Sequence, residues 1–298
     1  MICYKTCPSC DADDIKPVLE VKDFVASKEI FSIWHCSNCS LRFTQNIPDE
    51  GAIANYYQSD NYISHTNTRK GLIYTLYHIV RKHTLRKKRK LIATIIGKPS
   101  GSLLDIGSGV GIFPAYMQHK GWQVTAIEPA ADVRTAALKQ YGLQALPTEA
   151  LLNMKEKFDA ITLWHVLEHI HDLHNTIQKL SQLLEVHGKM FIAVPNYTCL
   201  DAAIYKNYWD GYDVPRHLYH FSPQAMQQLA HKHNLVIEKI KPMWYDSFYG
   251  CLLSEKHKRK GKKTHFIKGM WNGFVSNIEA FFDHSKCSAI TYILKRNG

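Results

Sequence analysis

From residue 102 onward, short apolar runs alternate with longer segments whose apolar residues recur at helical spacing. This βα alternation predicts an α/β fold: a doubly wound, mostly parallel sheet of seven strands, covered by helices on both faces. The expected strands are 102–106, 123–127, 143–146, 158–164, 189–194, 236–241 and 288–295. The expected helices run from a glycine-rich loop to about residue 120 and over 130–141, 174–186 and 222–233.

The α/β domain is expected to span 99–298. Its segment 244–283 is aromatic and basic, and we predict a helical insertion there, placed as a lid before the last strand. Residues 46–98 are predicted as a helical linker region, with a long helix at 72–96. A polar stretch before this helix contains Tyr56, Tyr57 and Tyr62.

Residues 1–45 are expected to form a small separate module with a hairpin whose strands are 18–25 and 30–34. Two C-x2-C pairs, 25 residues apart, flank that hairpin. Two such pairs can supply four thiolates to one tetrahedral zinc ion, and a closed shell of this kind is structural. A redox thiol pair is the alternative. The predicted zinc ligands are Cys7, Cys10, Cys36 and Cys39.

Composition changes this picture little. Hydrophobic residues make up 45% and charged residues 21%, which is ordinary for a globular protein. The net charge of +11 comes largely from residues 81–90, with seven Lys/Arg in ten, and 256–263, with six in eight. These runs are either solvated faces or contacts to an anionic partner such as a nucleotide-linked substrate, nucleic acid or a membrane surface.

No apolar run reaches the roughly 18 residues that a membrane span needs. The first residues also lack the apolar core of a signal peptide. We therefore expect a cytoplasmic protein without a membrane span.

In a doubly wound sheet, ligands bind where the strands end. The first strand of the domain ends in the glycine loop D-I-G-S-G-V-G, with a G-x-G-x-G spacing. Glycines allow a sharp turn and a close approach of a ligand to the backbone. The second strand ends in Glu128-Pro129, and a carboxylate there can accept hydrogen bonds from ribose hydroxyls. Loop and acid together predict a site for an adenosyl group.

The fourth strand ends in W-H-V-L-E-H. With this run, the loop and Glu128, the chain resembles class I S-adenosylmethionine-dependent methyltransferases, which have a Rossmann-like fold. The resemblance implies that this cofactor binds the loop, the ribose-binding acid and the exit of the fourth strand. The implied cofactor residues are Asp105, Gly107, Ser108, Gly109, Gly111, Glu128, Pro129, Trp164, His165, Glu168 and His169.

The same run also matches the H-x-x-E-H pattern of zinc peptidases. That pattern requires both histidines on one α-helix, whereas here it directly follows an expected strand. The peptidase interpretation is therefore the weaker one.

A four-cysteine module ahead of such a domain resembles sugar C-methyltransferases and related small-molecule enzymes, as does the segment 213–222. In them this segment borders the acceptor pocket, which implies His217 or His220 as the general base and Tyr57 as an orienting group. We expect a small-molecule acceptor of sugar, quinone or natural-product type, methylated on carbon or oxygen. An RNA methyltransferase and a binding protein without activity are the alternatives, and the oligomeric state is open.

Overall fold

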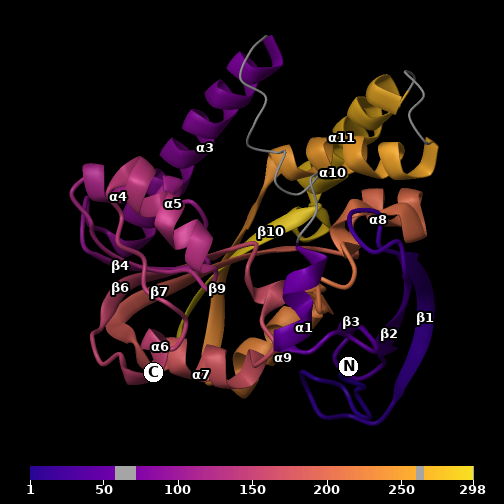
Figure 1. Cartoon of the computed structure of the whole chain (residues 1–298), viewed down its shortest axis with the longest axis horizontal. Coiled ribbons are helices and arrows are strands. Elements are labelled where there is room, and N and C mark those ends of the chain that lie inside the picture. The colour runs from indigo at the N-terminus through magenta and orange to yellow at the C-terminus, as the bar shows by residue number, and fades with distance from the viewer. Residues whose placement is uncertain (58–71, 260–264, 298) are drawn as a thin grey trace.

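The computed structural model describes residues 1–57, 72–259 and 265–297, which form two sheets with flanking helices (Figure 1). The larger sheet has six strands in the order β5-β4-β6-β7-β10-β9. Strands β4 to β7 are parallel, whereas β10 runs antiparallel to both of its neighbours. The bounds are β4 Ser102–Ile106, β5 Gln123–Ile127, β6 Phe158–Trp164, β7 Leu184–Pro195, β9 Leu235–Pro242 and β10 Ala289–Arg296. The predicted α/β fold is confirmed.

Helices cover both faces of this sheet because successive strand residues point to opposite sides. On one face, Leu103 and Ala160 pack with Ile92 of α3 and Phe113 of α4. On the other, Leu104 belongs to a second cluster that includes residues of α7 and α9. The helices are α3 Leu72–Ile96, α4 Ile112–His119, α5 Ala131–Tyr141, α6 Ala150–Asn153, α7 Leu173–Gln182 and α9 Pro223–Lys232.

The prediction of a seventh strand at 143–146 is not confirmed. This segment makes a single parallel bridge, between Leu146 and Ile127. Two backbone hydrogen bonds hold Leu146, one to Ala126 and one to Glu128. Pro147 follows and has no N–H to continue the ladder.

The boundary between α7 and β7 also differs from the expectation. The helix ends at Gln182 rather than at 186, and β7 begins at Leu184 rather than at 189. The extra strand residues pair with β6 through a register shift between Phe158 and Ala160. Apolar spacing alone therefore overestimated the helix, because the irregular start of β7 lacks a regular strand pattern.

The smaller sheet combines the N-terminal residues with a distant segment. Its order is β1-β2-β3-β8, and all of its pairs are antiparallel. Strand β8 lies within the segment predicted to border the acceptor, so this segment is fixed by pairing with β3. The bounds are β1 Ile15–Lys22, β2 Ile30–Cys36, β3 Arg42–Thr44 and β8 Tyr219–His220.

Strand β1 ends at Lys22 instead of residue 25 because Asp23 organises the following turn. Its carboxylate accepts hydrogen bonds from the backbone N–H groups of Val25, Ala26 and Ser27. Asp23 is buried. A tight turn with a buried carboxylate therefore replaces the predicted continuation of the strand.

The segment before β10 is helical, as predicted, and it forms a hairpin of two helices. Helix α10 covers Trp244–Arg259 and α11 covers His265–Phe282. Figure 1 shows the pair at one end of the molecule, next to α8 (Leu200–Tyr205). A short helix α1 (Glu50–Ile53) follows the N-terminal sheet. Tyr62 and residues 260–263 of the second basic run lie outside the described residues.

None of the helices in the described part of the chain combines the length and apolar character that a membrane crossing needs.

Arg216 joins three segments that lie far apart in the sequence. Its guanidinium group is buried and donates to Asp23 Oδ1 (3.1 Å), to both carboxylate oxygens of Asp213 (2.5 and 3.0 Å) and to the Tyr56 carbonyl (2.9 Å). Opposite charge and hydrogen bonds outweigh burial and lower the pKa of both carboxyl groups. One side chain thus ties the N-terminal hairpin, the linker and the 213–217 segment together.

Replacing Arg216 by Met should destabilise the protein by about 3–5 kcal/mol, because Asp23 would keep a buried charge without its partner. Urea unfolding measures the change. The matched control is Lys232→Met, which breaks the exposed ion pair with Asp11 and should change stability far less. Adding Asp23→Asn to Arg216→Met should restore part of the loss. Equal effects of the two single Met variants would contradict this assignment.

Candidate functional site

The order of strands reverses between β4 and β6, since β5 lies on one side of β4 and β6 on the other. A crevice at the carboxyl ends of the strands is expected at such a point. The glycine loop after β4 and the turn after β6 meet there. A Cβ atom placed on Gly107 would lie 2.5 Å from Cγ2 of Val166, so only glycine permits this approach.

The glycine loop is held in an open shape by backbone geometry. Gly107, Gly109 and Gly111 have φ angles of 66°, 54° and 84°, in the left-handed region that favours glycine. The Ser108 N–H donates to the Ile127 carbonyl (2.9 Å), which ties the loop to β5. No atom lies within 4 Å of a Cβ built on Gly109. The middle of the loop therefore has room for a ligand against its backbone.

Glu128 faces this loop from the end of β5. Its carboxylate accepts hydrogen bonds from the N–H groups of Gly109 (2.8 Å) and Ala130 (3.1 Å). Burial raises the pKa of this carboxyl group, while the two N–H donors act in the opposite direction. A carboxylate has about four acceptor positions, so positions remain for two ribose hydroxyls. The adjacent Pro129 contributes its carbonyl to Arg134 (2.6 Å).

Asp105, the acidic residue of β4, accepts a hydrogen bond from the Thr162 hydroxyl at 2.5 Å. Burial raises its pKa to about 7. Lys88 of α3 lies nearby, with Nζ 4.0 Å from the centre of the Trp164 ring, and burial lowers its pKa to about 8. The sequence offered no signal for Lys88 beyond its place in a basic run. Only the packing of α3 on the sheet separates it from the six other cations there.

His165 follows β6 with a φ of 57°, a strained conformation for a residue other than glycine. Its Nε2 lies 3.0 Å from Asp246 Oδ2 of α10, and its Nδ1 lies 3.5 Å from Glu168 Oε1. Burial disfavours the imidazolium, but the two carboxylates outweigh it and raise the pKa of His165 to about 10. His165 is therefore a cation that connects the helical hairpin to the site.

Glu168 and His169 lie on a short 3-10 helix, Leu167–His169, and not on an α-helix. The helical context of a zinc peptidase is thus absent, and that interpretation is excluded. Glu168 is fully buried. Burial favours its neutral form, but His165 and the two nearby histidines lower the pKa of its carboxyl group. Glu168 is therefore a buried anion.

His169 and His217 have defined tautomers. His169 Nδ1 lies 2.9 Å from the Arg216 carbonyl, and His217 Nδ1 lies 2.9 Å from the Gly211 carbonyl. A carbonyl only accepts, so each Nδ1 carries the proton and each neutral ring keeps its lone pair on Nε2. The Tyr57 hydroxyl lies 3.0 Å from His169 Nδ1. Burial lowers the pKa of His169 to about 4, so this ring is neutral near pH 7.

One side-chain ligand atom each of Glu168, His169 and His217 lies within 4.8 Å of the other two. The rings of the two histidines meet edge to face, with centroids 4.6 Å apart. A carboxylate next to a neutral imidazole can support a proton transfer to that ring. Two imidazoles and a carboxylate can alternatively hold a divalent cation.

His220 is placed differently from His217. It lies on β8, is fully buried, and its Nε2 is 3.1 Å from the Thr44 hydroxyl of β3. Burial holds the pKa of its ring well below the usual value. Its hydrogen bond is thus to the smaller sheet, and it does not belong to the group of Glu168, His169 and His217.

The four cysteines of the N-terminal pairs gather at one point. Cys7 and Cys39 have their sulfurs 3.5 Å apart, and those of Cys10 and Cys36 are 3.6 Å apart. All four sulfurs lie within 4.8 Å of one another. The tetrahedral zinc–thiolate geometry, with bonds of about 2.3 Å, implies sulfur–sulfur distances of about 3.8 Å. The donor set therefore fits zinc.

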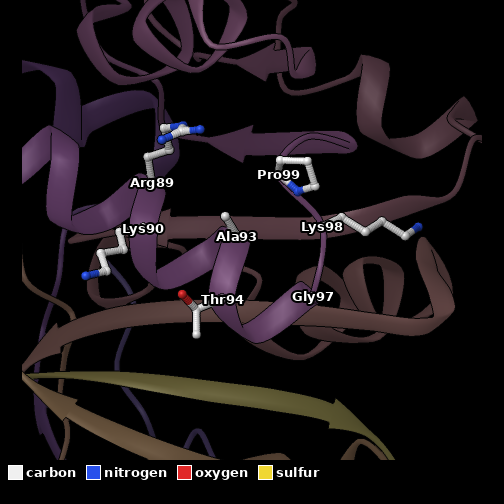
Figure 2. A pocket seen from close by; sticks show the side chains of 7 residues that line it. All are labelled: Arg89, Lys90, Ala93, Thr94, Gly97, Lys98 and Pro99. Atoms are coloured by element: carbon white, nitrogen blue, oxygen red, sulfur yellow. The ribbon is translucent and has the colours of Figure 1, made fainter.

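A hollow in the surface lies away from these residues. It has a volume of about 380 Å³ and is formed by the end of α3 and the turn before β4 (Figure 2). None of the predicted site residues lines it. Its residues are Arg89, Lys90, Ala93, Thr94, Gly97, Lys98 and Pro99.

Comparison with known proteins gives one family. A model of the methyltransferase domain matches residues 77–240, which is more than half of the chain. A ubiquinone biosynthesis O-methyltransferase of Glaesserella parasuis serovar 5 is 34% identical over 108 residues, covering 32% of this chain and 46% of that protein. The mitochondrial ubiquinone biosynthesis O-methyltransferase of Rattus norvegicus is 29% identical over 175 residues, covering 52% and 50%.

The chain thus spans about half the length of the curated relatives it matches. Among solved structures, a mitomycin 7-O-methyltransferase superposes with a TM-score of 0.47 at 13% identity, covering 81% of this chain and 63% of that one.

Proposed function

The chain belongs to the methyltransferase domain family, and on this premise we propose that it moves a methyl group from S-adenosylmethionine to a hydroxyl oxygen of a quinone-type small molecule. The observation that best supports this cofactor is the position of Glu128, whose carboxylate lies beside the open face of Gly109. The names of the relatives support an oxygen acceptor of quinone type. Carbon methylation and an RNA acceptor, both expected as options from the sequence, have less support.

Three groups would hold the cofactor. Glu128 would accept the ribose hydroxyls, and the loop of Gly107, Gly109 and Gly111 would face the cofactor with its backbone. Lys88 would pair with the carboxylate of the methionine part, because its ammonium already lies over Trp164 at the end of β6. S-adenosylmethionine, when bound, supplies a methyl group on a positively charged sulfur.

His217 is our candidate for the general base. Its Nε2 lone pair would take the proton from the acceptor hydroxyl as the oxygen forms its bond to the methyl carbon and the carbon–sulfur bond breaks. Glu168, within 4.8 Å, would stabilise the resulting imidazolium. Tyr57 and His169 form a hydrogen-bonded pair at the same point and would orient the acceptor.

We also propose that Cys7, Cys10, Cys36 and Cys39 hold one structural zinc ion. Cys7, Cys36 and Cys39 belong to the same core cluster as residues of α7 and α9. The His174 ring, on α7, contacts the Pro8 carbonyl at 3.0 Å. The metal would thus fix the N-terminal knuckles against the larger sheet and stabilise the fold without taking part in the reaction.

Replacing Glu128 by Ala should weaken S-adenosylmethionine binding about 10- to 100-fold, because hydrogen bonds to a charged acceptor are worth about 1.5–3 kcal/mol. Isothermal titration calorimetry measures the affinity. Asp132→Ala is the control, since Asp132 is an exposed acid in the first turn of α5 and should leave binding unchanged. Unchanged affinity in Glu128→Ala would place the ribose elsewhere.

Replacing His217 by Asn should lower kcat about 100-fold or more, the usual contribution of a general base, with S-adenosylmethionine affinity unchanged. Asn can keep the hydrogen bond to the Gly211 carbonyl but has no equivalent of Nε2. Methyl transfer from radiolabelled S-adenosylmethionine to hydroquinone-type acceptors provides the assay. The exposed His187→Asn serves as control.

A full rate in His217→Asn would remove His217 as the base. Treatment with a chelator distinguishes the role of general base from that of metal ligand. Loss of activity with EDTA, restored by magnesium, would instead assign Glu168, His169 and His217 to a divalent cation.

Metal analysis should find about one zinc per chain, and Cys36→Ser should lose it together with thermal stability. Cys3→Ser is the matched control, because Cys3 is exposed and lies outside the cluster. Zinc retained at full occupancy in Cys36→Ser would disprove the four-thiolate site.

A further inference from the structure

Helix α11 has an inverted distribution of side chains. Its buried positions carry small or polar residues, whereas its exposed positions carry large apolar ones. The side facing the protein consists of Gly269, Asn272, Gly273, Ser276 and Ala280. The exposed apolar residues are Phe266, Ile267, Met270, Trp271, Phe274, Ile278, Phe281 and Phe282. We call these eight residues the α11 apolar face.

The orientation of α11 is fixed by close packing. A Cβ on Gly273 would lie 2.8 Å from the Phe248 Cα of α10, and one on Gly269 would lie 3.0 Å from the Leu252 Cα. On the same side, Asn272 donates to the Tyr205 hydroxyl and Ser276 donates to Asp201, each at 2.8 Å. Rotating α11 to bury the apolar face would break these contacts. The exposure therefore belongs to the folded state.

Such an exposed surface is unusual. Phe282 is 82% exposed, Ile267 77% and Trp271 63%. Burying a large apolar side chain is worth about 1.5–3 kcal/mol, and contiguous exposed apolar patches commonly mark interaction sites. The α11 apolar face is thus a surface suited to a partner that takes up apolar side chains.

Exposed cations lie on the same hairpin. They are Lys256 and Lys258 at the end of α10, and Lys268 on α11, whose Nζ lies 3.9 Å from Glu255 Oε1. The segment 244–283 carries seven Lys/Arg against four Asp/Glu. The basic run of α3 reaches the start of the same hairpin, where Lys87 Nζ lies 5.5 Å from the centre of the Tyr245 ring. The partner should therefore also be anionic.

We propose that the α10–α11 hairpin docks on an anionic lipid surface, with α11 lying in the plane of the membrane interface. An aromatic and aliphatic helix face with exposed lysines on the same hairpin has the chemistry of interfacial helices. A second copy would bring two basic segments together, and RNA would leave the aliphatic side chains in water. The inference is independent of the proposed methyl transfer.

Vesicle sedimentation tests the proposal with the full chain. The protein should sediment with phosphatidylcholine vesicles that contain phosphatidylglycerol, and much less with phosphatidylcholine alone. Trp271→Ser combined with Phe274→Ser should reduce the partition coefficient about tenfold or more, because two interfacial anchors are lost. Lys256→Glu combined with Lys258→Glu should remove the preference for anionic lipid.

Leu152→Ser combined with Val186→Ser is the matched control. These residues are 74% and 75% exposed but lie on α6 and β7, so their loss should leave vesicle binding unchanged. All variants should retain the thermal unfolding of the unmodified chain and its S-adenosylmethionine affinity. Absence of vesicle binding, or equal binding by the Trp271/Phe274 variant, would overturn the proposal. So would a dimer that this variant dissociates, or binding of polyuridylate, without vesicle binding.

Discussion

The buried guanidinium of Arg216 is the interaction on which both the fold and the site depend. It bonds to Asp23 in the N-terminal hairpin, to Asp213 and to the Tyr56 carbonyl. Its own carbonyl accepts the Nδ1 proton of His169, and the next residue is His217. Burying the charges of Arg216 and Asp23 costs solvation energy, which only complete hydrogen bonding can offset. That requirement fixes the backbone from which both histidines project.

The same network makes the folding stability depend on pH. The pKa values of Asp23 and Asp213 are lower in the folded chain than their usual values. Both carboxylates therefore contribute stability above the usual pKa of an aspartate, and this contribution is lost as pH falls through the lowered values. Acid should loosen the contact between the hairpin and the 213–217 segment, which supports His217.

The predictions that agree best with the structure are those that depend only on neighbouring residues in the sequence. The bounds of β6 and α3 agree with the expected 158–164 and 72–96 because local signals define them. These are a short apolar run in β6 and the glycine- and proline-containing segment 97–101 after α3. Strand β8 was not predicted, because it has only two residues and its partner β3 lies far away in the sequence. Nothing local distinguishes it from a loop. The opposite occurred at 143–146, where a full strand was predicted and only a single bridge at Leu146 is present.

The site divides in the same way. The glycine loop and Glu128 are contiguous with β4 and β5, so their spacing was visible. Lys88 and Asp246 come from helices outside the strand–loop units, and only tertiary packing brings them to Trp164 and His165. For the apolar residues of α11, the sequence pattern suggests the wrong location. In the sequence they resemble core residues, and only the packed position of Gly269 and Gly273 shows that they face outward.

The charges around the proposed base form a consistent set. His165, with a pKa of about 10, is a cation, Glu168 beside it is an anion, and His169, with a pKa of about 4, is neutral. Under the proposed reaction, the positive charge on sulfur disappears while a proton arrives on His217. Glu168 lies beside His217, where the new charge would develop. Because Asp246 holds His165 in place, the hairpin that we assign to the lipid surface also fixes one member of this set.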